Sequence, residues 1–155
     1  MSLNILSFFV FYKLILFSVL GFGFFFSNLF FKKALNENLG FVGLLGLFFL
    51  LIYSYYSHIL IPHTYFHNII ILVTGLFLFI YFVKSSNFLS FKILLINFSF
   101  LFLILLLFKT HDDFHYYHFP YSYYLTQNPL LVGVGQFNHG FRTPSSIFYL
   151  NSLFF

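Results

Sequence analysis

Residues 39–61 read LGFVGLLGLFFLLIYSYYSHILI and contain no lysine, arginine, aspartate or glutamate. An α-helix rises about 1.5 Å per residue, so about 20 apolar residues cross the roughly 30 Å of hydrocarbon in a bilayer. This segment is long enough to do so. Three further segments meet or approach the same length: residues 5–31, 65–83 and 91–108. The sequence therefore predicts an all-α integral membrane helical bundle with about four transmembrane helices.

The composition excludes a water-soluble domain. Hydrophobic residues make up 61% of the chain and charged residues only 6%, whereas a soluble domain carries about 25% charged residues. The lysine and arginine residues are scattered along the chain, so the net charge of +4 does not indicate a nucleic-acid partner. The absence of cysteine excludes disulfides and thiolate metal sites. The expected partner is the lipid bilayer.

The connections between the predicted spans indicate how the chain crosses the membrane. Residues 32–38 (KKALNEN) and 84–92 are basic, whereas residues 62–68 (PHTYFHN) contain no lysine or arginine and begin with a helix-ending proline. The positive-inside rule places the two basic connections in the cytoplasm. We therefore expect a multi-pass protein of the cell (inner) membrane with the polar loop 109–146 extracytoplasmic. Lys13 lies inside the first span and is expected to extend its ammonium group outwards to the interface.

The loop at residues 110–146 holds most of the residues capable of chemistry. Both aspartates, Asp112 and Asp113, lie in this loop, and the predicted topology places all seven histidines on the same outer side. Thr110 followed by the two acids is typical of a helix start, and Pro120 is expected to end that helix. We therefore expect short interfacial helices, with tyrosines at the headgroup level. A carboxylate pair here is equally a candidate general base or ligand of a divalent cation.

Two other patterns in the loop point to metal or nucleotide binding. His111, His115 and His118 are spaced i, i+4 and i+7, which on one helix would bring three imidazoles to one face for zinc or copper. The short helix before Pro120 argues against this, and we expect no transition metal bound to these histidines. The glycines within residues 133–140 lack the following lysine and the spacing of a nucleotide-binding loop. A nucleotide site is therefore rejected.

Residues 143–155 predict the start of another helix. Thr143 and Pro144 supply a capping hydroxyl and a proline at the first helical position, and the apolar run 147–155 follows them. A run of nine residues cannot cross a bilayer as a helix. We interpret it as the beginning of a truncated hydrophobic helix, and the chain as the N-terminal part of a longer protein.

One pattern in the loop resembles a known family. It consists of Asp113-x-x-x-Tyr117-His118-x-Pro120-Tyr121, then Gly135-Gln136-Phe137-Asn138-His139-Gly140-Phe141-Arg142, then Ser145-Ser146. This combination resembles bacterial polytopic membrane proteins related to the C-type glycosyltransferases, which use lipid-phosphate-linked sugars. The resemblance implies that Asp113 is the catalytic base and Asp112 its acidic neighbour. It implies that the substrate-binding residues are Tyr117, His118, Asn138 and Arg142.

These observations lead to two main hypotheses about function. The first is the N-terminal part of a membrane glycosyltransferase-like protein, anchored by residues 1–109, that transfers sugar from a polyprenyl-phosphate donor to a cell-envelope glycan or lipid. This part alone is expected to be inactive, and a divalent cation is the one cofactor left open. The second is a small non-enzymatic integral membrane subunit of a larger complex, since Phe-rich chains with few charges are common among such subunits. A histidine-based metal or proton site is a third interpretation.

Overall fold

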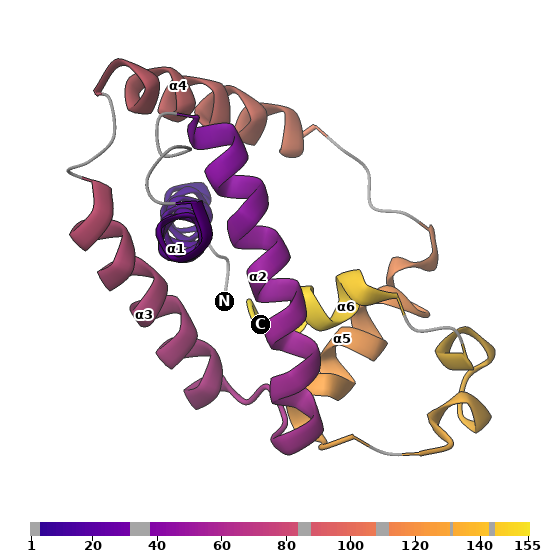
Figure 1. Ribbon diagram of the computed structural model, residues 1–155. Helices are drawn as coiled ribbons and strands as arrows, with labels where there is room; N and C mark the ends of the chain where they lie inside the picture. The colour runs from indigo at the N-terminus through magenta and orange to yellow at the C-terminus, as the bar shows by residue number, and fades with distance from the viewer. Residues whose placement is uncertain (1–3, 32–37, 84–87, 108–111, 131, 143–144) are drawn as a thin grey trace. The chain divides into compact units, whose positions relative to one another are not determined.

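The computed structural model describes residues 4–31, 38–83, 88–107, 112–130, 132–142 and 145–155 (Figure 1). The α-helices in these stretches are α1 (Ile5–Phe31), α2 (Leu39–Leu60), α3 (Tyr65–Phe82), α4 (Phe88–Leu105), α5 (His118–Gln127) and α6 (Ser146–Ser152). Three short 3-10 helices accompany them: η2 (Asp112–Phe114), η3 (Val134–Gln136) and η4 (His139–Arg142). The described residues contain no strand, which confirms the predicted all-α fold.

Helices α1, α2 and α3 are long and apolar enough to cross a membrane, with 27, 22 and 18 residues. Their large hydrophobic side chains are exposed on many sides, as expected for helices solvated by lipid. α4 (Phe88–Leu105) is also apolar and has 18 residues. All four predicted helices are thus present, and α1, α2 and α3 meet the length and hydropathy of a membrane span within the described residues. The chain is a membrane protein.

The chain divides into two compact units. The first unit comprises Met1–Phe49 and Leu72–Phe108, and the second comprises Leu50–Ile71 and Lys109–Phe155. α2 and α3 each contribute to both units. The first unit therefore holds most of the apolar helical residues, and the second holds the polar loop that the sequence marks for function.

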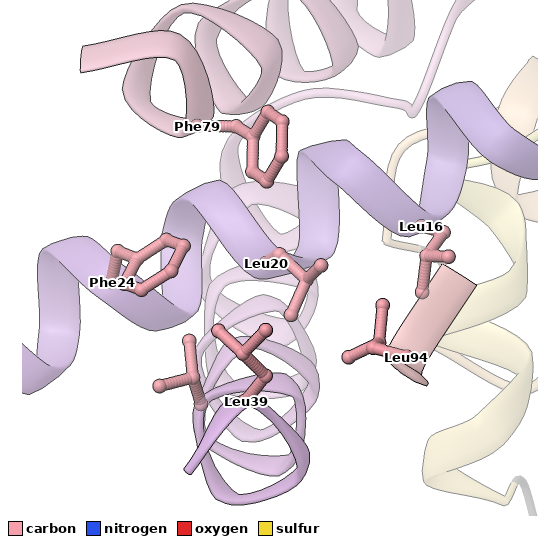
Figure 2. Close-up of a cluster of buried hydrophobic side chains, with 7 residues drawn as sticks. Leu16, Leu20, Phe24, Leu39, Phe79 and Leu94 are labelled. Atoms are coloured by element: carbon pink, nitrogen blue, oxygen red, sulfur yellow. The ribbon is translucent and has the colours of Figure 1, made fainter. Parts of the chain in front are cut away.

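The core of the first unit forms where α1 meets three other helices. Leu16, Leu20 and Phe24 recur at every fourth position of α1, so they lie on one face of that helix. They pack against buried side chains of α2, α3 and α4: Leu39, Val42, Phe79 and Leu94. Figure 2 shows the labelled side chains converging from these helices. This cluster is the apolar centre of the first unit.

Small residues bring α1 into backbone contact with its neighbours in the first unit. A Cβ atom on Gly46 of α2 would overlap the backbone carbonyl of Val19 in α1. A Cβ atom on Gly21 of α1 would overlap the carbonyl of Gly75 in α3. Such close packing between small residues is characteristic of membrane helices. In Figure 1, α1 is seen almost end-on between α2 and α3.

The sequence predicts that Lys13 extends outwards to the interface. In the structure, Lys13 instead forms hydrogen bonds with α4. Its ammonium donates to the Ser99 hydroxyl at 2.8 Å and to the Leu95 carbonyl at 3.3 Å. The Ser99 hydroxyl itself donates to the same carbonyl at 2.7 Å. Hydrogen bonds from a neighbouring helix take the place of the aqueous interface. The prediction for Lys13 is therefore wrong.

The core of the second unit joins α5 to α6. Tyr121 and Leu125 of α5 pack against Phe148 and Tyr149 of α6, and all four are buried. α6 is capped by Ser145, whose hydroxyl accepts a hydrogen bond from the Ile147 N–H at 3.4 Å. The sequence instead predicts a cap at Thr143, which lies outside the described residues. α6 ends at Ser152, and a turn follows.

Candidate functional site

Asp112 and Asp113, the predicted catalytic acids, lie in η2 and are both exposed. The Asp113 carbonyl accepts a 2.8 Å hydrogen bond from the Tyr117 N–H, which turns the chain towards α5. η2 is a single turn, and Pro120 lies in the first turn of α5 rather than at a helix end. Proline is tolerated there because the N–H groups of a first turn have no intrahelical partner. The expectation that Pro120 ends a helix is wrong.

Tyr117, His118 and Asn138, three of the four predicted substrate-binding residues, lie around the start of α5. The Asn138 side chain donates to the Tyr116 carbonyl at 3.1 Å, which attaches the segment after η3 to the residues before α5. The rings of Tyr117 and His118 meet the Phe148 ring edge-on, at centroid distances of 4.9 and 5.2 Å. Burial raises the pKa of Tyr117 above its ordinary value.

Arg142, the fourth predicted substrate-binding residue, lies at the end of η4 and is exposed. Its Nε donates to the Gly135 carbonyl at 3.4 Å, which joins the end of η4 to η3. A Cβ atom on Gly135 would overlap the Arg142 side chain, which explains the glycine at this position. The structure therefore brings Tyr117, His118 and Asn138 together, and places Arg142 on a neighbouring turn.

Among the described histidines of the loop, His115 and His118 do not lie on one helix. His115 lies in the turn between η2 and α5, His118 begins α5, and His111 falls outside the described residues. The helix that the i, i+4, i+7 spacing requires is absent from the described part of this segment. Nor do those residues contain a group of three or more histidine, cysteine or acidic side chains arranged to hold a metal ion.

A second polar cluster, which the sequence analysis missed, lies where α2 turns into α3. His63, in this turn, has a fully buried ring. Its Nδ1 is 2.6 Å from the Ser152 hydroxyl of α6, and its Nε2 is 2.8 Å from the Ser57 hydroxyl of α2. Its backbone N–H donates to the Leu125 carbonyl of α5 at 3.0 Å. One residue thus joins α2, α5 and α6.

The direction of these hydrogen bonds follows from the carbonyl oxygens at their ends, which can only accept. The Ser152 hydroxyl donates to the Tyr149 carbonyl at 2.7 Å, so it accepts from His63 Nδ1, which carries the proton. The Ser57 hydroxyl lies 3.3 Å from the Ser54 carbonyl but only 2.8 Å from His63 Nε2, so in the neutral ring Nε2 accepts from Ser57. Both nitrogens of His63 are therefore satisfied in the neutral ring, and its tautomer is defined.

The directions of the hydrogen bonds of His67 and Asn68, at the start of α3, follow in the same way from carbonyl acceptors. The Asn68 amide donates to the carbonyls of Ser152 and Phe155, at 2.7 and 3.1 Å. Its side-chain oxygen therefore accepts from His67 Nδ1 at 3.1 Å. His67 Nε2 is left to accept from the Tyr53 hydroxyl at 2.9 Å. Asn68 thus attaches residues 152–155 to α3.

His58 completes the histidine cluster (His58, His63 and His67). The His63 ring stacks on His67 at 5.0 Å and meets His58 edge-on at 5.2 Å. His58 Nε2 donates to the Asn128 carbonyl at 3.1 Å, and its Nδ1 is buried without a hydrogen-bond partner among the described residues. Charged imidazolium rings this close would repel one another, so the arrangement favours neutral rings.

The environment of His63 has a clear effect on its titration. Burial, then the neighbouring His67 and His58, lowers the pKa of His63 from 6.5 to about 3. The Ser57 hydroxyl lies beside the basic Nε2 at the distance of a nucleophile and its base. Both side chains are buried, however, which denies a substrate access. We therefore interpret the cluster as a hydrogen-bonded core that fixes α6 to α2 and α3.

The sequence did hold a signal for this cluster. Residues 53–68 (YSYYSHILIPHTYFHN) gather hydroxyls and imidazoles around a helix-ending proline between two apolar helices. Sequence reasoning placed these histidines at the membrane interface. It could not supply the partners Leu125, Asn128 and Ser152, because the chain reaches them only some 60 to 90 residues later.

Comparison of the chain with protein-family models, with curated proteins and with solved structures found no match. The functional conclusion therefore depends on the residues themselves.

Proposed function

We propose that the chain is the N-terminal part of a glycosyltransferase-like enzyme of the cell (inner) membrane, with residues 109–146 on the extracytoplasmic side. The enzyme transfers sugar from a polyprenyl-phosphate donor to a cell-envelope glycan or lipid. The observation that carries the proposal is the exposed pair Asp112 and Asp113 directly before α5, because a base must be open to its acceptor. The sequence resemblance within residues 113–146 supports the same reaction.

In the proposed reaction, the Asp113 carboxylate takes the proton of an acceptor hydroxyl. The acceptor oxygen forms a bond to the anomeric carbon while the bond from that carbon to the phosphate oxygen breaks, and the polyprenyl phosphate leaves with the electron pair. The exposed Arg142 guanidinium pairs with the phosphate. A divalent cation at Asp112 would serve the same purpose.

The test is sugar transfer by the protein expressed from its complete reading frame, in membrane vesicles supplied with a radiolabelled polyprenyl-phosphate sugar. Asp113→Asn removes the base without changing the size of the side chain. Loss of a general base lowers a rate about 10²- to 10⁴-fold, so we expect a fall of about that size in transfer. Tyr116→Phe is the control at a neighbouring exposed side chain that has no role in the proposed reaction, and it is expected to retain activity. Undiminished transfer by Asp113→Asn removes Asp113 from the mechanism.

A second candidate function is a non-enzymatic integral membrane subunit of a larger complex. It is favoured by the histidine cluster, whose polar groups hold helices together and are closed to a substrate. A tagged protein extracted in mild detergent would then co-purify in fixed proportion with other membrane chains. Sugar transfer by the purified protein alone would contradict this candidate.

A further inference from the structure

One face of α5 borders a cavity of about 400 Å³ in the second unit. Phe119, Tyr123 and Gln127 recur at every fourth position and line it, with Phe141 from η4 on the same cavity. The opposite face of α5 is the buried one, at Tyr121, Ser122, Leu125 and Thr126. The volume falls in the range of small-molecule sites, roughly 300–1,000 Å³. We call this cavity the α5 groove.

Two aromatic rings form a platform in the α5 groove. Phe119 and Tyr123 stack with an interplanar angle of 10° and a centroid distance of 5.9 Å. Their side chains remain 42% and 49% exposed. The face of an aromatic ring is electron-rich and attracts positively polarised C–H groups. A pyranose ring presents such a row of C–H groups on one of its faces.

Polar groups border the same platform. The amides of Gln127 and Asn128 line the α5 groove, together with the Tyr124 side chain. The Tyr124 hydroxyl is buried and has no hydrogen-bond partner among the described residues. The Gln127 amide already donates to the Thr126 hydroxyl at 2.9 Å and the Asn128 amide to the Tyr124 carbonyl at 3.4 Å, so the two amide oxygens are left to accept from the hydroxyl groups of a ligand, which a lipid chain lacks.

We propose that the α5 groove binds one pyranose ring of a carbohydrate, stacked on Phe119 and Tyr123 and hydrogen-bonded by Gln127 and Asn128. The proposal rests on the proposed function, in which it supplies the site for an acceptor sugar. The stacked rings recognise the apolar face of the sugar, and the amides recognise its hydroxyls. Recognition by one stacked ring and a few hydrogen bonds predicts weak binding that tolerates several sugars.

The test is saturation-transfer-difference NMR on the full-length protein in lipid nanodiscs. The probes are methyl β-D-glucopyranoside and methyl N-acetyl-β-D-glucosaminide. We expect the saturation to reach the ring C–H protons of at least one probe. Tyr123→Ala should weaken binding about tenfold, within the roughly 0.5–1.5 kcal/mol of an aromatic stacking contact. Tyr123→Phe keeps the ring and should bind as the wild type does.

Tyr116→Ala is the matched control, because Tyr116 is 78% exposed and does not line the α5 groove. It should leave binding unchanged. No transfer to either probe in the wild-type protein, or equal transfer in wild type and Tyr123→Ala, overturns the proposal. Asp113→Asn separates the two proposals, because it should abolish transferase activity and keep the sugar signal. Transferase activity without a sugar signal refutes the groove alone, and a sugar signal without transferase activity refutes the proposed enzyme alone.

Discussion

Replacing Ser152 by alanine tests whether the histidine cluster stabilises α6. Ser152 accepts the proton of His63 Nδ1 at 2.6 Å and donates to the Tyr149 carbonyl at 2.7 Å. In the alanine variant Nδ1 stays buried without a hydrogen-bond partner, whichever ring nitrogen carries the proton. The other ring nitrogen already faces Ser57 at 2.8 Å, so the ring cannot turn to another partner without losing that bond.

The magnitude follows from this loss. A buried donor without a partner costs about 1–3 kcal/mol, and side-chain hydrogen bonds between membrane helices contribute about 0.6 kcal/mol on average and up to about 1.7. We therefore expect Ser152→Ala to lower the free energy of opening α6 by about 1–2 kcal/mol. Because about 1.4 kcal/mol corresponds to a tenfold change in an equilibrium constant, amide exchange in α6 should accelerate about 5- to 30-fold.

Hydrogen exchange followed by mass spectrometry on peptides covering residues 146–155 measures this local opening directly. Asn151→Ala is the matched control, since Asn151 is exposed on the same helix. Its exchange rate should stay within about twofold of the wild type. Equal exchange in Ser152→Ala and Asn151→Ala would refute the assignment of His63 as a buried donor to Ser152.

A double variant sharpens the same test. In His63→Leu the Ser152 and Ser57 hydroxyls both keep a carbonyl acceptor, at 2.7 Å to Tyr149 and 3.3 Å to Ser54. Adding Ser152→Ala to His63→Leu therefore strands no buried donor. The double variant should be about 1 kcal/mol more stable than the sum of the two single effects, because neighbouring groups in one network couple. Strict additivity would show that the two side chains do not interact.

Two further predictions concern pH and helix packing. Because the pKa of His63 is lowered from 6.5 to about 3, the unfolded chain binds a proton between these values that the folded chain does not. Stability is nearly complete at neutral pH and falls as the pH drops towards 3, by about 1.3 kcal/mol at about pH 5.5 relative to pH 7; hydrogen exchange corrected for its intrinsic pH dependence should show this loss, and His63→Leu should reduce it. In the first unit, Gly46→Ala should destabilise by about 1–3 kcal/mol, because the new methyl would overlap the Val19 carbonyl. Gly43→Ala is its control, since a Cβ atom there would meet only the Leu20 side chain at an ordinary 3.8 Å; equal unfolding midpoints for the two variants in a detergent titration would contradict the close approach of α1 and α2.

The helices of the chain were predictable because the apolar segments are long. The segment at residues 39–61 became α2 (Leu39–Leu60) and the segment at residues 5–31 became α1 (Ile5–Phe31). Hydrophobic length fixes a membrane helix without reference to its neighbours. Lys13 and Pro120 were predicted wrongly because their outcome depends on context. The carbonyl that Lys13 meets lies on another helix, and the position of Pro120 depends on where α5 begins.

The candidate sites also differ in how far the sequence alone could predict them. Asp112 and Asp113 could be found from sequence, because acids are rare in this chain and their exposed position follows from the polar loop. The sequence shows that histidines gather near the turn between α2 and α3, but it does not predict their hydrogen-bond partners. One of these partners, Ser152, lies 89 residues after His63. The α5 groove gave no signal, because in a chain with 30 phenylalanines and 12 tyrosines two aromatic residues four positions apart carry little information.

Among the described histidines on the predicted outer side of the membrane, one group is buried and another is exposed. His58, His63 and His67 are buried and joined to other helices, so their chemistry is used for folding. His115 and His139 are exposed in the loop, so they are accessible to solvent. α5 links the histidine cluster to the α5 groove. The His63 N–H holds the buried face of α5 at Leu125, and the other face of α5 forms the groove. A loosened histidine cluster should therefore weaken saccharide binding to both probes alike, by releasing α5, whereas a change within the groove should alter the preference between them.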